Sequence, residues 1–101
     1  MKKSKTERGF AIIEFIDRYD HKCSLQKSSL AFEQAIWIGV DDPDPKIMAS
    51  EVTLPDEPTR TGWVKYPIPD GVLINTRMHL TQEQVKELLP HLQKFVETGE
   101  L

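Results

Sequence analysis

The sequence has few of the cysteine and histidine residues that disulfides and metal sites require. Cys23 is the only cysteine among the 101 residues, so an intrachain disulfide is excluded. His21 and Cys23 would share one face of an extended segment, and His79 or His91 would have to complete a metal site. The usual zinc-ligand spacings are absent, so we expect neither a metal nor a cofactor.

The chain also lacks long hydrophobic runs and glycine-rich loops. No apolar run approaches the roughly 20 residues that a membrane span needs, and no apolar signal core follows the basic N-terminus. The five glycines are scattered, which leaves no P-loop, no dinucleotide-binding fingerprint and no nucleophile elbow. We therefore expect a cytoplasmic, non-catalytic protein that does not bind a membrane.

The charge excess is small and uneven. A net charge of −3 argues against general nucleic-acid binding, which needs a basic face. Residues 41–57 carry −5 and residues 1–9 carry +3, so the remaining body has a net charge of −1. The net charge of the chain therefore reflects mainly these two segments, and a small anionic ligand remains compatible with the body of the protein.

Hydrophobic patterning predicts an α+β fold. Runs at 10–16, 23–27, 35–40 and 72–78 are rich in β-branched, aromatic or alternating apolar residues and predict strands. Thr81 and Gln84 form a capping box that begins a helix. One apolar face continues in phase through this helix, so we expect a single helix kinked at Pro90. The predicted fold is an antiparallel β-sheet of three to five strands packed against a C-terminal α-helix.

Two segments lie outside this core. We expect residues 1–9 to be a flexible basic arm and residues 10–101 to be a single domain. Six of the seven prolines fall between positions 43 and 69, which predicts a proline-rich acidic loop at about 41–62, with a short helix or edge strand at 46–50. The exposed edges of so small a sheet favour a homodimer or a higher homo-oligomer.

Asp41, Asp42 and Asp44 are the candidate partner-binding residues. Their spacing does not match an EF-hand, because the glycine and the bidentate glutamate of that loop are missing. One interpretation is an acidic, proline-stiffened loop without a partner. The other is a contact surface for a basic protein.

Five residues are candidates for ligand binding. Aromatic rings offer a stacking surface for a flat base, and Lys or Arg can hold phosphates; the set is Lys27, Trp37, Trp63, Tyr66 and Arg77. Arg77 also precedes the predicted helix N-terminus, where free backbone N–H groups favour an anion. The alternative is that the tryptophans are core or dimer-interface anchors and that Arg77 is a solvated strand residue. Ser28 or Ser29 with a histidine would be a catalytic pair only if the fold brought them together.

Most of the chain resembles a family of small proteins encoded by phages and prophages. The resemblance rests on five segments, at 23–29 (CSLQKSS), 37–42 (WIGVDD), 62–67 (GWVKYP), 76–81 (TRMHLT) and 95–101 (FVETGEL). It implies an accessory protein that counters host defence inside a bacterial cell. Two such classes are similar in size: the Thoeris anti-defence proteins, which sequester a cyclic nucleotide signal, and the anti-CRISPR proteins, which block an effector by protein contact.

These observations lead to three alternative hypotheses of function. The first is stoichiometric capture of a small nucleotide ligand, such as a cyclic nucleotide signal. The second is inhibition of a host defence protein through the acidic loop. The third is a small nucleotide-processing enzyme, which would turn its ligand over instead of releasing it unchanged.

Overall fold

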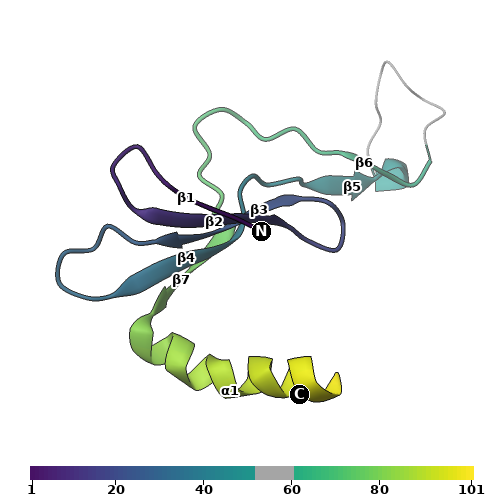
Figure 1. Ribbon diagram of the computed structural model, residues 1–101. Coiled ribbons are helices and arrows are strands. Elements are labelled where there is room, and N and C mark those ends of the chain that lie inside the picture. The colour runs from purple at the N-terminus through teal and green to yellow at the C-terminus, as the bar shows by residue number, and fades with distance from the viewer. Residues whose placement is uncertain (52–60) are drawn as a thin grey trace. The chain divides into compact units, whose positions relative to one another are not determined.

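The computed structural model describes residues 1–51 and 61–101 and divides the chain into two compact units (Figure 1). The first unit comprises residues 1–41 and 76–101, and the second comprises residues 42–75. This differs from the single domain that we expect from the sequence. The difference arises because the proline-rich middle of the chain forms a small sheet of its own.

The first unit is an antiparallel five-stranded sheet followed by one helix, which confirms the predicted α+β class. The strand order is β1-β2-β3-β4-β7, with β1 and β7 at the edges. The elements are β1 (Lys2–Lys5), β2 (Ala11–Ile16), β3 (Lys22–Lys27), β4 (Ala35–Val40), β7 (Arg77–Thr81) and α1 (Gln82–Thr98). No helix in the described part of the chain is both long and apolar enough to cross a membrane.

The register separates the sheet into an apolar face and a polar face. Leu25 pairs with Ile13 of β2 and with Ile38 of β4. Because side chains alternate along a strand, one face collects the apolar residues of every central strand; they include Ile13, Phe15, Cys23, Leu25, Ile36, Ile38, Val40, Met78 and Leu80. The opposite face carries Ser24, Gln26, Trp37, Gly39, Arg77 and His79. We call these the apolar face and the polar face.

Helix α1 begins and ends as its sequence predicts. Thr81 is the N-cap, and its side chain accepts from the Gln84 N–H while the Gln84 side chain accepts from the Thr81 N–H. Gly99 takes a left-handed conformation with φ of 76° and donates its N–H to the Phe95 carbonyl at 2.8 Å. The helix runs through Pro90 as a single element. It contacts the sheet mainly through β7, and none of its residues is buried.

The second unit contains a short hairpin. Strand β5 (Lys46–Met48) pairs with β6 (Trp63–Lys65), and a 3₁₀ turn, η1 (Ala49–Glu51), follows β5. Val64 is buried opposite Ile47 and anchors the hairpin. Of the short helix or edge strand that we expect at 46–50, the structure shows a strand at 46–48 that runs into the 3₁₀ turn. Asp56 and Glu57, which contribute to the predicted acidic loop, lie outside the described residues.

Residues 1–9 differ from the predicted flexible arm. Strand β1 pairs with β2 along its whole length, from Lys2↔Glu14 to Lys5↔Ala11. The segment lacks the hydrophobic alternation of a half-buried strand, and it is held instead by backbone pairing at the sheet edge. A lysine-rich edge strand is a common device against further strand pairing.

The last strand also lies later than predicted. We expect a strand at 72–78, whereas β7 begins at Arg77 and continues to the helix N-cap. Its register with β4 explains the shift, because Thr81 pairs with Ala35 and Arg77 pairs with Gly39.

Candidate functional site

Six side chains on or beside the polar face form one contact network, which we call the Trp37 cluster. They come from the β3 strand and its end, from β4 and from β7, and they are Ser24, Gln26, Ser28, Trp37, Arg77 and His79. The antiparallel register places these positions on neighbouring strands, so residues far apart in the sequence lie side by side.

Trp37 and His79 stack on each other. They are cross-strand partners in the β4–β7 register, their ring centroids lie 3.8 Å apart, and their planes differ by 7°. Ser28 also fixes the imidazole, since its Oγ lies 2.9 Å from His79 Nε2 at the edge of the ring. Ser28 is itself buried, so the hydrogen bond holds the ring in one orientation.

Arg77 reaches across β4 because Gly39 has no side chain. Gly39 lies between Ser24 and Arg77 in the sheet register. The Arg77 guanidinium passes over it and donates from Nη1 to Gln26 Oε1 at 2.8 Å and to Ser24 Oγ at 3.3 Å. Its Cζ lies 5.6 Å from the centroid of the Trp37 ring, which is a cation–π distance.

The positive charge of Arg77 has no carboxylate partner among the described residues. Its hydrogen-bond acceptors are the neutral side chains of Gln26 and Ser24. Ser24 is 1% exposed and donates its own hydroxyl to Asp41 Oδ1 at 2.6 Å. Asp41 therefore fixes the serine that helps to orient the arginine.

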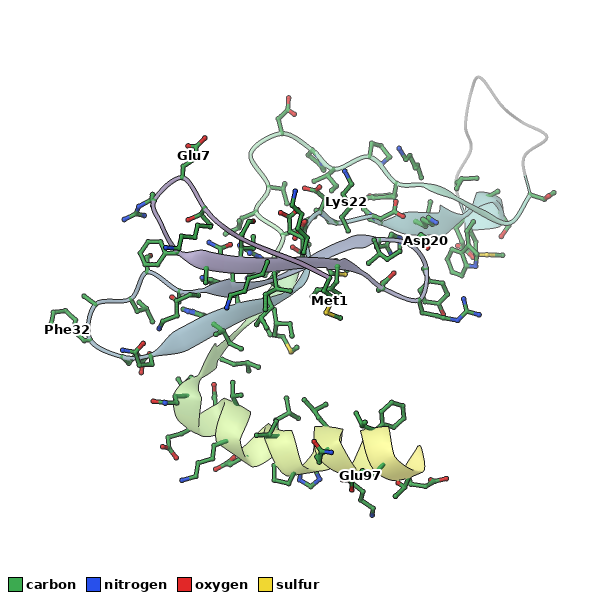
Figure 2. The ribbon with its side chains drawn as sticks, in the orientation of Figure 1. Met1, Glu7, Asp20, Lys22, Phe32 and Glu97 are labelled. Atoms are coloured by element: carbon green, nitrogen blue, oxygen red, sulfur yellow. The ribbon has the colours of Figure 1, made fainter. Side chains whose placement is uncertain are left out.

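A hollow of about 330 Å³ lies next to Trp37 on the same face. The β1–β2 turn, the end of β3 and the middle of β4 line it with Thr6, Glu7, Arg8, Phe10, Gln26, Ser29 and Trp37. Figure 2 shows Glu7 at the tip of this turn. The Arg8 guanidinium lies over the Phe10 ring, 5.7 Å from its centroid. The hollow thus combines two aromatic walls, a cation and several hydrogen-bonding groups.

The turn that lines the hollow is held by hydrogen bonds to Thr6. Thr6 Oγ1 accepts from the Phe10 N–H at 3.1 Å, and the Thr6 carbonyl accepts from the Gly9 N–H at 2.9 Å. Gly9 has a φ of 86°, which closes the turn in a conformation that favours glycine. Arg8 and Phe10 are therefore presented from an ordered turn.

The fold brings only two of the five predicted ligand-binding residues together. Trp37 and Arg77 lie in one cluster. Lys27 is on the apolar face, opposite Ile36 in the register, and donates to Gln34 Oε1. Trp63 and Tyr66 belong to the second unit, where both are exposed.

The three candidate acidic residues have different surroundings. Asp41 accepts the Ser24 hydroxyl and belongs to the first unit. Asp42 and Asp44 begin the second unit and are exposed. Asp44 forms an ion pair with Lys46 at 3.5 Å, so part of its charge is already compensated.

Two of the first backbone N–H groups of helix α1 are hydrogen-bonded within the chain. The Gln84 N–H donates to Thr81 Oγ1, and the Gln82 N–H donates to the Gln34 carbonyl at 3.0 Å. The first-turn N–H groups on which the sequence argument rests are thus partly satisfied within the chain. Arg77 acts with the strand residues around it instead.

Sequence reasoning missed several members of the site. Gln26, His79, Arg8 and Phe10 were not among the candidate ligand residues, although period-two alternation places Gln26 on the same face as Ser24. The most useful signal is Gly39, because a glycine inside a strand often marks a close approach of another chain segment.

A second group of polar residues closes the β2–β3 turn. Asp17 Oδ1 accepts the N–H of Tyr19 and of His21, and Oδ2 lies 3.3 Å from His21 Nδ1. The His21 backbone N–H is the main reason that the pKa of Asp17 is lowered. Burial raises the pKa of the Cys23 thiol, which keeps it protonated. Within residues 1–51 and 61–101, no three His, Cys, Asp or Glu side chains are grouped to hold a metal ion.

Comparisons with models of protein families, with curated proteins and with solved structures found no match.

Proposed function

We propose that this protein binds, without turnover, a small anionic ligand that carries a flat ring, and that the ligand is of the nucleotide class. The observation that carries the proposal is the position of Arg77. Its guanidinium is held by neutral acceptors beside the Trp37 ring and close to a hollow of ligand size. Clefts of about 300–1,000 Å³ with a few convergent polar groups are typical of small-molecule sites.

The ring of the ligand would stack against the free side of Trp37. In the sheet register, Trp37 has His79 on one side and Gln26 on the other. His79 already covers the side toward β7, so the hollow lies on the side toward β3. Gln26 and Ser29 line the same hollow and supply hydrogen bonds to the edge of a base.

The anionic part of the ligand would be held by arginine. Arg8 lines the hollow, and Arg77 contacts its neighbours Gln26 and Trp37. The planar arginine fork matches phosphate oxygens, and each such charge-assisted contact is stronger than a neutral hydrogen bond. Glu7 is the one acid in the lining, and it suits an N–H group of a base better than a phosphate.

The contact between Ser28 and His79 supports binding and not catalysis. A nucleophilic serine needs an approaching substrate and a histidine oriented by a third group. Ser28 is only 4% exposed, and in the described part of the chain His79 has no carboxylate partner. The pair therefore serves to orient the imidazole that backs the Trp37 ring.

The resemblance to small phage and prophage proteins implies either capture of a cyclic nucleotide signal or inhibition of an effector by protein contact, and our proposal takes the first of these. A phage protein in a bacterial cytoplasm would counter host defence by sequestering a cyclic nucleotide signal. The two arginines and the aromatic hollow are the features on which this more specific proposal depends.

Calorimetric titration tests the proposal directly. The purified protein is titrated with cyclic ADP-ribose isomers and with cyclic di- and trinucleotides, and we expect one of them to bind at one ligand per site. The bound molecule should be recovered unchanged after denaturation of the protein. Absence of heat with every ligand at micromolar protein would reject the nucleotide class, and steady turnover with excess ligand would replace capture by catalysis.

A matched pair of variants assigns the binding to the site. Arg77→Gln removes the charge beside Trp37, and we expect roughly 10- to 100-fold weaker binding, which corresponds to the loss of one charge-assisted contact. Arg18→Gln removes the same charge from an exposed turn and should leave the affinity unchanged. Equal affinities of the two variants would contradict the assignment. Salt-sensitive capture of one host protein without nucleotide heat, lost in Asp42→Asn, would instead favour an inhibitor that acts through the acidic loop.

A further inference from the structure

A second hollow, of about 360 Å³, lies in the first unit where the end of β3, strands β4 and β7 and the first turn of α1 meet. Figure 1 shows this end of the sheet, where β7 leads into α1. The lining is mostly apolar, and it shares no residue with the Trp37 cluster or with the hollow beside Trp37. We call it the Lys27 hollow. The proposed function makes no use of it.

Three residues of the lining form a row across the sheet. Lys27 of β3 pairs with Ile36 of β4, and Ile36 pairs with Leu80 of β7. Directly paired residues project from the same face, here the apolar one. Val85 of the first helical turn adds a further apolar side chain to the lining. The row covers two strand spacings, about 10 Å, with a cation at the β3 end and apolar side chains over the rest.

Lys27 brings a charge into this hollow that nothing in the lining neutralises. Its side chain is half-buried, and Nζ donates to Oε1 of Gln34, which is a neutral amide. Within residues 1–51 and 61–101, no carboxylate forms an ion pair with Lys27, and no acidic residue lines the hollow. Taking a charge out of water is unfavourable unless an opposite charge or hydrogen bonds compensate it. The hollow therefore favours an anionic group next to Nζ.

Two amide side chains in the same lining complete the polar part of the hollow. Gln34 presents its oxygen to Lys27, which leaves the N–H groups of its Nε2 as donors. Gln82, the first residue of α1, also lines the hollow and has an exposed side chain. An ionised carboxylate only accepts hydrogen bonds, so an ammonium group and amide N–H groups match it.

We propose that the Lys27 hollow binds a small carboxylic acid with an apolar body. The carboxylate lies at Lys27, and the apolar body lies against Ile36, Leu80 and Val85. The volume is within the range of about 300–1,000 Å³ that small-molecule sites occupy. An aliphatic lining with one cation suits this ligand better than a nucleotide, which needs aromatic stacking partners. The inference stands apart from the proposed function, because the two sites have no residue in common.

Titration of the full chain with octanoate, followed by NMR of its methyl groups, tests the proposal. Octanoate carries a carboxylate on a straight apolar chain, and octanol has a chain of the same length without the charge. We expect saturable shifts of the methyl resonances of Ile36, Leu80 and Val85 with octanoate. Octanol should bind roughly tenfold more weakly, which corresponds to the loss of one charge-assisted contact.

Three variants assign the binding to the hollow. Lys27→Gln removes its charge and should weaken octanoate binding roughly tenfold without changing the affinity for octanol. Lys22→Gln is the matched control, because it removes the same charge from the exposed opposite end of β3 and should leave both affinities unchanged. Gln82→Glu keeps the shape of the side chain and adds an acid at the start of α1, where a negative charge favours the helix. It should therefore fold, and it should weaken the binding of octanoate but not of octanol.

Several results would overturn the proposal. Equal affinities for octanoate and octanol would mean that the charge of Lys27 plays no part. Shifts that do not saturate, or shifts confined to methyl groups outside the hollow, would mean that no such site exists. If Lys27→Gln fails to fold, Gln82→Glu decides the question, and octanoate binding that this variant leaves unchanged would reject the hollow as the site.

Discussion

Gly39→Ala tests whether the close approach of β7 to β4 builds the Trp37 cluster. A Cβ at this position would lie 2.6 Å from the Thr76 carbonyl oxygen and 2.9 Å from Arg77 Cα, both of which are backbone atoms. Neither can move away as a flexible side chain would, so β7 itself must shift. The φ of 150° is, in addition, one that residues with a side chain rarely adopt.

The expected cost has two parts. The unfavourable φ costs about 1–3 kcal/mol, and forcing an extra carbon against packed backbone costs about 1–3 kcal/mol more. Gly9→Ala is the matched control, because Gly9 has a φ of 86° but no atom within 4 Å of the point that an alanine Cβ would occupy, so it incurs the conformational cost alone. Gly39→Ala should therefore be less stable than Gly9→Ala by about 1–3 kcal/mol.

Urea unfolding followed by circular dichroism measures this difference, with both variants at one protein concentration. In a domain of this size, each 1 kcal/mol lowers the thermal midpoint by about 4–8 °C, so thermal unfolding gives an independent reading. The shift of β7 should also weaken the bond from Arg77 to Gln26 and the stack of Trp37 on His79. Equal stabilities of the two variants would refute the argument that Gly39 is required for close strand approach.

Three further predictions concern the helix cap, acid stability and the buried thiol. Thr81→Ala removes the oxygen that accepts the Gln84 N–H and should lower the free energy of unfolding by about 1 kcal/mol in urea titrations, and an unchanged value would argue against the cap. Hydrogen bonding lowers the pKa of Asp17 in the folded state, so ionised Asp17 stabilises the fold above the ordinary aspartate pKa, and this stabilisation is lost as the pH falls through the folded value. Asp17→Asn should therefore lose less stability on acidification than the unaltered chain. Parallel profiles of stability against pH would contradict this prediction. Burial raises the pKa of Cys23, so a disulfide reagent should label it slowly in the folded protein and rapidly in denaturant, whereas fast labelling without denaturant would contradict the burial.

The parts of the fold that the sequence predicts are those specified by local signals. The capping box at Thr81 and Gln84 sets the start of the helix, and Gly99 sets its end. The strand at 35–40 is recovered with its bounds because its β-branched and aromatic residues suit a central, partly buried strand. In these segments, local propensity and tertiary packing favour the same structure.

The parts that differ depend on partners distant in the sequence. Strand β1 has a polar sequence, and only its pairing with β2 makes it a strand. The second unit exists because β5 and β6 pair across a long proline-containing connection. No local pattern in either segment specifies the partner, so composition alone favours an arm and a loop there.

The candidate site shows the same division. Sequence reasoning selects stacking aromatic residues and cations, and of these Trp37 and Arg77 lie together in the structure. Their environment depends on cross-strand register, which brings Gln26 and His79 beside them and places Lys27 on the other face. A one-residue change of register would exchange the two faces, which is why residue type alone cannot assemble such a site.

Tryptophan fluorescence of the Trp63→Phe protein tests the central claim most directly. This variant leaves Trp37 as the only tryptophan, so a change in emission on titration with cyclic ADP-ribose isomers or cyclic di- and trinucleotides reports on the Trp37 cluster alone. We predict saturable quenching by one of these ligands, weakened roughly 10- to 100-fold by Arg77→Gln in the same background. Emission that stays constant with every ligand, or quenching that Arg77→Gln leaves unaltered, would contradict the account.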